Sequence, residues 1–325
     1  MKAIVTGGAG FIGSHLVDRL LAQGDQVLVI DNFSTGRKEN LKRGMEIGGE
    51  RLEVIDCDIR DTRVDAEFER FKPDQVFHLA AQMNVRYSVL DPVFDCEVNT
   101  CGTVRLLEAA RKVGVKKFIF SSTGGAIYGE QETFPAPEDH PTAPKCPYGV
   151  SKRSAELYLS YYAMSSEIEA LSMRFANVYG PRQNSKGEAG VVAIFCERAL
   201  ANSELRVNGD GLQTRDYVFV SDVVSALSCV SQYTYSGGYR VYNVGTGCEH
   251  TVLDIVHELR DIYSEDRDAP KSNDFRFVHG PEMPGEQRRS SVDSSRLREL
   301  GWSPRVNFSQ GIRDTFLSFA KSGVA

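Results

Sequence analysis

Short, continuously apolar runs alternate with longer amphipathic segments through the first half of the chain. Runs such as 27–30 and 118–120 show no polar alternation, which is typical of strands covered on both faces of a parallel sheet. The pattern predicts strands over 2–6, 26–30, 52–57, 75–80, 116–121 and 169–175. It predicts helices over 11–23, 62–71, 92–113 and 147–164. Alternation of this kind indicates a doubly wound α/β sheet.

The rhythm of the chain changes beyond about residue 178. Connections lengthen, and Gly and Pro interrupt the sequence repeatedly. A second region with fewer parallel strand–helix units is therefore expected. We predict a large domain over 1–178 with returning segments about 215–248, and a smaller C-terminal region over 179–214 and 249–325.

Gly7, Gly10 and Gly13 follow the first predicted strand and open the first predicted helix. Glycine lets the backbone approach a pyrophosphate without a Cβ clash, and a helix N-terminus offers N–H groups and a positive dipole end to that anion. This context predicts a dinucleotide site of the Rossmann type. Asp31 ends the second strand, 18 residues beyond Gly13. Its carboxylate would bind both ribose hydroxyls and repel a 2′-phosphate, so we predict NAD rather than NADP.

Further residues of the predicted cofactor site lie in the glycine turn or at the ends of later strands. Asp58 and Ile59 follow the third strand and would edge the adenine, whereas small residues at the end of the fourth strand would let the chain run close under the cofactor. The remaining members are Phe11, Ile12, Asn32, Ser34, Thr35, Gly36, Leu79, Ala80, Ala81, Gln82 and Ser121.

Tyr148 and Lys152 begin a predicted helix directly after Pro147, a residue suited to a first helical turn. Four-residue spacing puts both side chains on one helix face. An ammonium there, together with the positive nicotinamide ring, would favour the phenolate and make Tyr148 a general base. The hydroxyls of 121–123 end the fifth strand, at the carboxyl edge of the sheet where such folds bind ligands.

Eight stretches together carry a family resemblance. They are TGGAGFIGSHL, DNFSTG, HLAA, FSSTGGAIYG, PYGVSK, RFANVYGPRQ, GLQTRDYVFVSDV and YNVGTG, and they run from residue 6 to residue 247, with a weaker echo near 285–302. On these motifs the chain resembles the extended short-chain dehydrogenases/reductases, and within them the UDP-glucose 4-epimerase group. The resemblance implies an NAD-dependent isomerase that inverts C4 of a UDP-hexose through a 4-keto intermediate.

The resemblance also assigns roles to the catalytic residues. Tyr148 would be the base, and Lys152 would hold the nicotinamide ribose and tune Tyr148. Thr123 would hydrogen-bond the reacting sugar hydroxyl, with Ser122 as the alternative. The chain has one more residue between Phe120 and Tyr128 than some family members, which leaves the choice between Ser122 and Thr123 open.

The same resemblance supplies further cofactor and substrate residues. Arg215 would grip the UDP diphosphate, helped by Arg288 or Arg289, because the planar guanidinium binds phosphate oxygens bidentately. Asn99 would lie near the cofactor, Phe175 and Val178 near the nicotinamide, Asn177 at the diphosphate or sugar, and Val191 and Val192 around the uracil.

Two departures from family patterns bear on the sugar. Members restricted to plain hexoses carry a bulky tyrosine at what corresponds to Ser290, so the small residue implies that N-acetylated sugars are accepted as well. Gln183 is followed by 184–188 without an arginine at the next position. Uronic-acid epimerases often carry one there, which disfavours UDP-glucuronate as substrate.

Other reactions on the same scaffold are the alternatives. A 4,6-dehydratase needs an acid next to Thr123, and a UDP-glucuronate decarboxylase usually has a glutamate close by; Gly124 and Gly125 stand there instead. A non-catalytic NAD-binding sensor would typically lack the Tyr or the Lys. Both are present, so an enzyme is favoured.

Composition limits the other possibilities. The 325 residues carry a formal net charge of −6, which argues against nucleic-acid or acidic-membrane binding. The seven cysteines form no C-x-x-C pair, so neither a metal site nor a disulfide framework is expected, and most thiols should be buried.

The start of the chain lacks a signal-peptide pattern and no apolar run could span a membrane, so a cytoplasmic protein is expected. Relatives pair through helices matching 92–113 and 147–164, which implies a homodimer.

Overall fold

The computed structural model describes residues 1–185, 190–235, 237–265, 275–282 and 287–321. Its centre is a sheet of seven parallel strands in the order β10-β6-β5-β4-β1-β2-β3. The order reverses on either side of β1, as in doubly wound folds that bind ligands at such a switch point. The strands are β1 Lys2–Thr6, β2 Gln26–Asp31, β3 Leu52–Asp56, β4 Gln75–His78, β5 Lys117–Thr123, β6 Glu169–Phe175 and β10 Tyr239–Val244.

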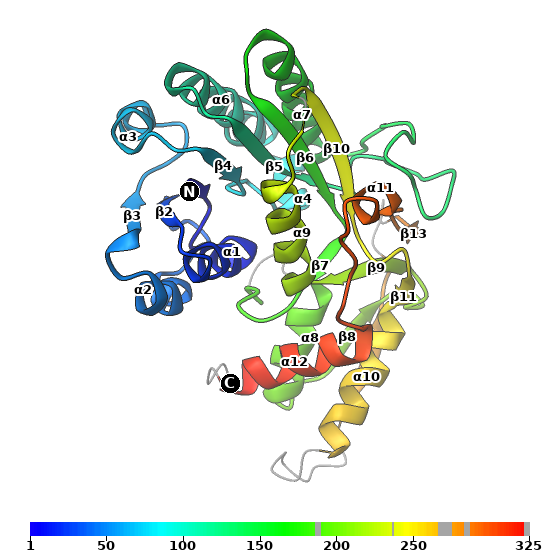
Figure 1. Cartoon of the computed structure of the whole chain (residues 1–325). Coiled ribbons are helices and arrows are strands. Elements are labelled where there is room, and N and C mark those ends of the chain that lie inside the picture. The colour runs from blue at the N-terminus through cyan, green and yellow to red at the C-terminus, as the bar shows by residue number, and fades with distance from the viewer. Residues whose placement is uncertain (186–189, 236, 266–274, 283–286, 322–325) are drawn as a thin grey trace.

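Helices cover both faces of this sheet (Figure 1). One apolar cluster joins the sheet to α1 (Phe11–Ala22) and α9 (Val220–Gln232). Another joins the opposite face to α3 (Arg63–Phe71), α6 (Gly102–Val113) and α7 (Pro147–Ser165). Because both faces are buried, the strands need no polar alternation, which is why their sequences are continuously apolar.

A smaller set of elements lies beside the carboxyl edge of the sheet, in the lower part of Figure 1. Two short sheets contain β7 Asn177–Tyr179, β9 Thr214–Phe219, β11 Glu249–Thr251 and β13 Arg289–Ser290 in one, and β8 Leu205–Asn208 and β12 Phe277–Gly280 in the other. A third apolar cluster packs them against α8 Val191–Leu200, α10 Val252–Glu265 and α12 Phe308–Lys321. The short helix α11 (Ser295–Arg298) contacts β10.

All six predicted strands are present, with bounds within two residues of the prediction. The sequence pattern did not predict the seventh strand, β10. It also did not predict the short helices α2 (Lys42–Gly48) and α4 (Val85–Leu90). The predicted helix 92–113 is divided into α5 (Pro92–Cys96), a π-helical turn η3 (Glu97–Cys101) and α6. A π-helical turn inside a longer helix is frequently found at a functional site, and this one holds Asn99.

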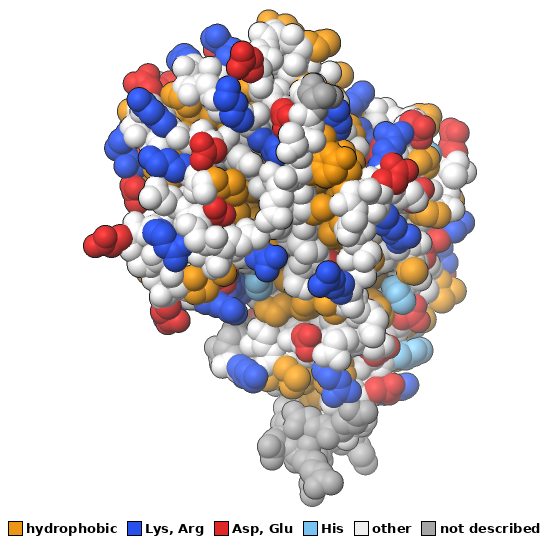
Figure 2. All heavy atoms as spheres, viewed as in Figure 1, with side chains coloured by type: hydrophobic (Ala, Val, Ile, Leu, Met, Phe, Trp, Pro, Cys, Tyr) orange, Lys and Arg blue, Asp and Glu red, His pale blue; other side chains and the backbone are white. Residues whose placement is uncertain are grey.

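The surface carries charges of both signs, and most of the cysteines are not buried. Figure 2 shows acidic and basic side chains mixed over one face of the molecule. The seven cysteines are free, but only Cys57 and Cys196 are buried, so the expectation of mostly buried thiols is wrong. No helix in the described ranges has both the length and the apolar character needed to cross a membrane.

A buried ion pair joins α7 to β6 behind the end of β5. Arg174 donates to both carboxylate oxygens of Glu156, at 2.9 and 2.7 Å, and both side chains are almost fully buried. Ser122 donates to the same carboxylate at 2.8 Å, and Arg174 also donates to the Tyr128 hydroxyl at 3.0 Å. The two opposite charges compensate each other in a position shielded from solvent. The ion pair therefore fixes α7 relative to the strand that carries Ser122 and Thr123.

We predict that Arg174→Met destabilises the fold, because it leaves the Glu156 carboxylate buried without its main partner. Removing one member of a buried pair lowers the free energy of unfolding by about 3–5 kcal/mol. Urea unfolding followed by the fluorescence of Trp302, the single tryptophan, measures the change. The control is Arg153→Gln, since Arg153 contacts the same carboxylate at 3.1 Å but is 34% exposed; it should change stability by less than about 1 kcal/mol. Equal losses in the two variants would contradict the prediction.

Candidate active site

A cleft of about 830 Å³ opens at the carboxyl edge of the main sheet. Its walls come from the ends of β1, β2, β4, β5 and β6, from β7, and from Arg215 on β9. Parallel strands bring all of their carboxyl ends to one edge, so residues far apart in sequence meet here. Most of the residues predicted for the cofactor and the reaction line this one cleft.

The glycine turn between β1 and α1 forms one end of the cleft. Gly7 has φ +68°, a conformation that L side chains rarely adopt, and a Cβ there would come within 2.7 Å of the Ala80 amide nitrogen. A Cβ on Gly13 would overlap with the carbonyl oxygen of Gly7. The turn is therefore packed tightly against the end of β4, and the N-terminus of α1 faces the cleft with its free N–H groups.

Asp31 ends β2 with its carboxylate held in place by the backbone. Oδ2 accepts from the Ala9 amide at 2.9 Å, and Oδ1 accepts from the Phe33 amide at 2.8 Å. Burial raises the pKa of Asp31, while these two amides oppose that rise. Gly36 does not line the cleft, but a Cβ there would meet Asp31 Oδ1 at 2.9 Å, so glycine gives the carboxylate its space.

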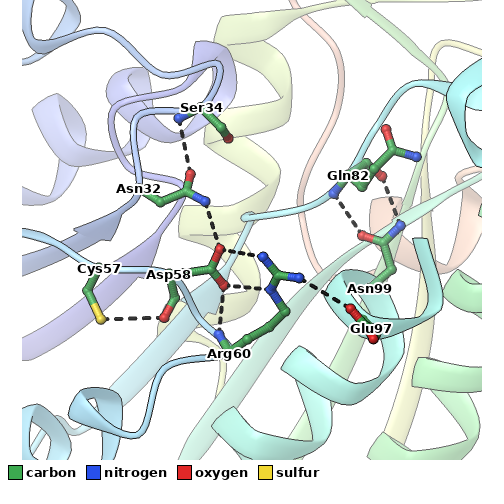
Figure 3. A network of polar contacts seen from close by, with 8 residues as sticks. All are labelled: Asn32, Ser34, Cys57, Asp58, Arg60, Gln82, Glu97 and Asn99. Atoms are coloured by element: carbon green, nitrogen blue, oxygen red, sulfur yellow. Dashed lines mark hydrogen bonds and ion pairs between the residues drawn. The ribbon is translucent and has the colours of Figure 1, made fainter. Parts of the chain in front are cut away.

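Asp58 is the centre of a polar network beside this end of the cleft (Figure 3). Arg60 donates to both of its oxygens, at 2.9 and 3.0 Å, and Asn32 donates to Oδ2 at 2.9 Å. Arg60 also reaches Glu97 at 3.4 Å. Hydrogen bonding to Arg60 lowers the pKa of Asp58 to about 2. The network ties the loops after β2 and β3 to the π-helical turn.

Tyr148 and Lys152 extend from the first turns of α7 into the middle of the cleft. The Lys152 ammonium donates to the Ser121 carbonyl at 2.8 Å and lies 4.6 Å from the centroid of the Phe120 ring and 5.9 Å from that of the Tyr148 ring. Both side chains therefore share one face of α7, as the four-residue spacing predicts.

The chain without a cofactor does not acidify the phenol of Tyr148. Burial raises the pKa of Tyr148, and the nearby Asp95 and Cys146 add to that rise. Burial lowers the pKa of Lys152 to about 7, which Asp95 and Glu156 oppose. Desolvation is the largest cause of both shifts. A phenolate in this cleft needs a further positive charge, such as that of an oxidised nicotinamide ring.

The two hydroxyls at the end of β5 have different surroundings. Ser122 is buried, and its hydroxyl donates to Glu156. Thr123 is partly exposed, and its Oγ1 accepts from the Ala126 amide at 3.2 Å. Both residues line the cleft, but the Ser122 hydroxyl proton already has an acceptor within the protein.

Six predicted site residues do not line the cleft in this structure. They are Gly36, Asn99, Val191, Val192, Arg288 and Ser290.

Packing explains where the first four of these residues lie instead. Gly36 supports Asp31 as described above. Asn99 is buried behind Gln82, which does line the cleft. Val192 is buried in the third apolar cluster and Val191 packs against that cluster, because an amphipathic helix turns such residues to its core.

Arg288 and Ser290 lie beside the cleft on a neighbouring segment. Arg288 forms a bidentate ion pair with Asp210 at 2.7 and 2.8 Å, at the edge of a separate cavity of about 140 Å³. Ser290 is buried in β13, where it is paired in register with Arg215. Arg289 pairs with Glu249 at 2.6 Å. Residues 186–188 of the predicted specificity segment and Glu286 of the basic loop lie outside the described residues.

Several lining residues were not predicted from the sequence. They include the segment 83–85 with Tyr87, and Glu130, Lys145, Cys146, Gln183, Gly190 and Gln287. Cys146 directly precedes Pro147 and Tyr148, and Gly190 directly precedes Val191. Their adjacency to predicted residues was a usable signal. Gln287 had the same signal, since it directly precedes Arg288, whereas Lys145 adjoins no predicted site residue and only the fold brings it to the cleft.

Comparison with known proteins places the chain in a family. The sequence pattern of the family described as GDP-mannose 4,6 dehydratase matches residues 4–315. The UDP-glucose 4-epimerase of Mycolicibacterium smegmatis is 45% identical over 316 residues, which cover 97% of each chain. The chain belongs to this family of extended short-chain dehydrogenases/reductases.

Solved structures agree with this extended short-chain dehydrogenase/reductase assignment. The UDP-glucose 4-epimerase of Thermotoga maritima, solved with UDP-glucose, is 43% identical, with a TM-score of 0.90 over 99% of each chain. The UDP-glucose 4-epimerase of Thermus thermophilus, solved as a complex with NAD, is 42% identical, with a TM-score of 0.88 over 98% of this chain and 99% of the other. The predicted family, fold class, enzyme class and cofactor are confirmed.

The cleft of this family member fits NAD. The glycine turn leaves no Cβ between the α1 N-terminus and a pyrophosphate, and Asp31 presents a carboxylate at the end of β2, where a ribose would lie. Tyr148 and Lys152 line the same cleft further along the sheet edge. In the described part of the chain, no group of three or more His, Cys, Asp or Glu side chains could hold a metal ion.

We predict that Gly13→Ala prevents NAD binding, because its Cβ would overlap with Gly7 and push the turn out of shape. Isothermal titration with NAD should show a loss of affinity of at least about 100-fold, equivalent to about 2.7 kcal/mol. Gly24→Ala is the matched control. Gly24 follows α1 with φ +89° but has open space around a Cβ, so it adds backbone strain without a clash. Unchanged affinity in Gly13→Ala would refute the role given to the turn.

Proposed function

We propose that this protein is an NAD-dependent 4-epimerase that interconverts UDP-glucose and UDP-galactose through a 4-keto intermediate. The observation that carries the proposal is the presence of Thr123, Tyr148 and Lys152 in the same cleft as the glycine turn and Asp31. The full-length similarity to proteins named UDP-glucose 4-epimerase supports it.

The residues of the cleft divide the work of this reaction. NAD would be held by the glycine turn and Asp31, and it would supply reversible hydride transfer at C4 of the sugar. Tyr148 takes the proton of the 4-hydroxyl and gives it back, and Lys152 holds the nicotinamide ribose and keeps a positive charge beside the phenol. Thr123 hydrogen-bonds the reacting hydroxyl. We favour it over Ser122 because the Ser122 hydroxyl already donates to Glu156.

The mechanism requires the sugar ring to rotate in the cleft while the diphosphate stays fixed. Arg215 lines the cleft on β9 and is proposed to clamp the diphosphate, together with Asn177 on β7. Arg288 would join them by exchanging its exposed ion pair with Asp210 for the phosphate. Val191 and Val192 are proposed to contact the uracil at the start of α8. Gly190, which directly precedes this helix, lines the cleft. Fixed phosphates and a loosely held sugar give both faces of C4 access to the same cofactor.

A 4,6-dehydratase needs an acid next to Thr123, and packing around Gly124 leaves little room for one. A Cβ on Gly124 would lie 2.8 Å from a Val292 methyl and 3.2 Å from the Phe175 carbonyl. The glycine is therefore required by packing, which disfavours a 4,6-dehydratase. Around Gly125 a Cβ would meet only ordinary contacts, so the absence of a decarboxylase glutamate there rests on the sequence alone. A UDP-glucuronate epimerase and a non-catalytic NAD sensor remain the other candidates.

We predict that Tyr148→Phe removes epimerisation while NAD stays bound. Loss of the acid–base group should lower kcat by about 1,000-fold, within the range for general acid–base catalysis. A coupled assay of UDP-galactose conversion to UDP-glucose gives kcat, and the absorbance of released nucleotide after denaturation gives NAD content. Tyr158→Phe, on the exposed side of the same helix, should keep wild-type kcat. Substantial turnover by Tyr148→Phe would end the proposed mechanism.

We further propose that UDP-N-acetylglucosamine and UDP-N-acetylgalactosamine are accepted. Ser290 is buried in β13, where it is paired in register with Arg215, which lines the cleft. A small side chain there leaves volume near C2 of the sugar that a tyrosine would fill.

Ser290→Tyr should therefore reduce kcat/KM for UDP-N-acetylglucosamine by about 100-fold or more, by steric exclusion, while changing UDP-glucose turnover by only a few-fold. Product analysis with both substrates measures the ratio. Ser290→Ala, which keeps the residue small, is the control and should retain both activities. Strict refusal of the N-acetylated substrate by the unmodified protein would refute the idea.

The architecture suggests how the protein is organised. We propose that residues 1–178 with about 215–248 bind NAD, and that 179–214 and 249–325 bind the nucleotide sugar.

We also propose a cytoplasmic homodimer that pairs through the helices within 92–113 and 147–164. The support is a set of exposed apolar side chains on α5 and α7, among which Val93 is 67% and Met164 is 78% exposed. Such surfaces are typical of protein interfaces.

A further inference from the structure

Asp95 is a fully buried carboxylate on α5 with only one of its oxygens satisfied. Oδ1 accepts from Gln82 Nε2 at 2.8 Å and from Asn99 Nδ2 at 2.9 Å. Oδ2 has no hydrogen-bond partner, and no Lys, Arg or His of the described residues forms an ion pair with Asp95. Burying a carboxylate without an ion-pair partner is unfavourable, which makes Asp95 a candidate for a functional role.

The surroundings of Asp95 suggest what that function is. α5 and the π-helical turn pack against α7, which carries Tyr148 and Lys152. The ionisable groups that act on this pair are Asp95 from α5, Glu156 from α7, Cys146 before it, and His78 from β4.

Among these groups, Asp95 differs from the other carboxylate. The charge of Glu156 is matched by the buried Arg174. His78 is held neutral because burial lowers its pKa well below the usual value. Asp95 therefore provides the negative charge near Lys152 that no arginine compensates.

Asp95 also fixes the chain under the cofactor site. Asn99, held by Asp95, donates to the Gln82 carbonyl at 2.8 Å and accepts from the Gln82 amide at 3.0 Å (Figure 3). The Gln82 side chain donates to Asp95 as well. Gln82 lines the cleft, so the carboxylate supports both the charge and the shape of this part of the site.

We propose that Asp95 is a positioning residue for the reaction: its negative charge keeps the proton on Lys152, and its hydrogen bonds hold Gln82 at the wall of the cleft. The inference rests on the proposed function of Tyr148 and Lys152. It gives α5 a role beyond packing, because Lys152 otherwise lies in a desolvated position that disfavours its charge.

The charge has a definite consequence for pH dependence. Burial lowers the pKa of Lys152 to about 7 even though Asp95 opposes that fall. Asp95 also raises the pKa of Tyr148. Removing the negative charge therefore lowers the pKa of both groups: the phenol loses its proton more readily, and so does the ammonium. Both limbs of a bell-shaped pH profile should move to lower pH together.

Asp95→Asn tests the charge with little change in shape, because the amide oxygen can still accept from Gln82 and Asn99. The NAD-loaded protein is assayed for UDP-galactose epimerisation between pH 5 and pH 10. We expect the whole profile to move to lower pH by about one pH unit, the lower end of the effect of a nearby charge. A loss of height without a shift would overturn the proposal, since a structural role alone predicts that result.

A second readout does not need activity. Carbon-13 NMR of labelled lysine side chains, with the Lys152 signal assigned by its absence in Lys152→Arg, follows the protonation of Lys152 directly. We expect the Lys152 titration to move to lower pH in Asp95→Asn. An unchanged titration would overturn the inference. If the unmodified protein fails to epimerise any UDP-sugar but the Lys152 titration still moves, the proposed function falls while the role of Asp95 stands.

Two further variants separate charge from position. Asp91→Asn makes the same charge change at the start of α5, where the side chain caps the helix by accepting from the Phe94 amide at 3.0 Å. Since asparagine also caps helices, we expect a wild-type profile and titration. Asp95→Glu restores the charge with altered hydrogen bonds, so its profile should stay at the wild-type pH even if its height falls. A shift in Asp91→Asn as large as that in Asp95→Asn would overturn the assignment.

Discussion

In the proposed mechanism, the site depends on keeping Lys152 charged in a buried position. Lys152 is buried, and its ammonium is surrounded by the Phe120 ring, the Ser121 carbonyl and the phenol of Tyr148. Desolvation opposes the charge. Carboxylates on α5 and α7 oppose this effect, although burial still lowers the pKa of Lys152 to about 7. The same arrangement disfavours the phenolate, so proton release from Tyr148 becomes favourable only when another positive group enters the cleft.

This balance explains why so much polar structure is buried behind the cleft. Glu156 receives hydrogen bonds from Ser122 and Arg174, and Arg174 reaches onward to Tyr128. A buried network is stable only when each member is satisfied. Because α7 and β5 are both tied to it, the helix that carries Tyr148 and the strand that carries Thr123 are held in one register. Precision at the reacting atoms is thus supplied by groups that never touch the substrate.

The sequence predicted those features that follow from local periodicity or from a motif. The parallel sheet, the glycine turn and the placement of Asp31, Tyr148 and Lys152 are of this kind. Helix α4 is only six residues long and lies inside a segment without motif, so its contribution to the cleft was missed. The acidity expected of Tyr148 with NAD bound stays a prediction, because in the chain alone burial raises the pKa of Tyr148. The sequence shows which charges are near one another along a helix, but burial, which dominates here, is a property of the whole fold.

Residues beside the cleft show a further limit of reasoning from motifs. Asn99 was expected to lie near the cofactor; it is buried behind the wall of the cleft and holds Gln82, which lines the cleft. Gly36 likewise gives room to the Asp31 carboxylate instead of facing the cleft. In both cases the motif residue supports its neighbour. A motif therefore contains residues that the site requires. The sequence alone does not show which of them contact the ligand and which only hold their neighbours in place. The separation requires the hydrogen bonds, and these single out Asp95, which belongs to no motif.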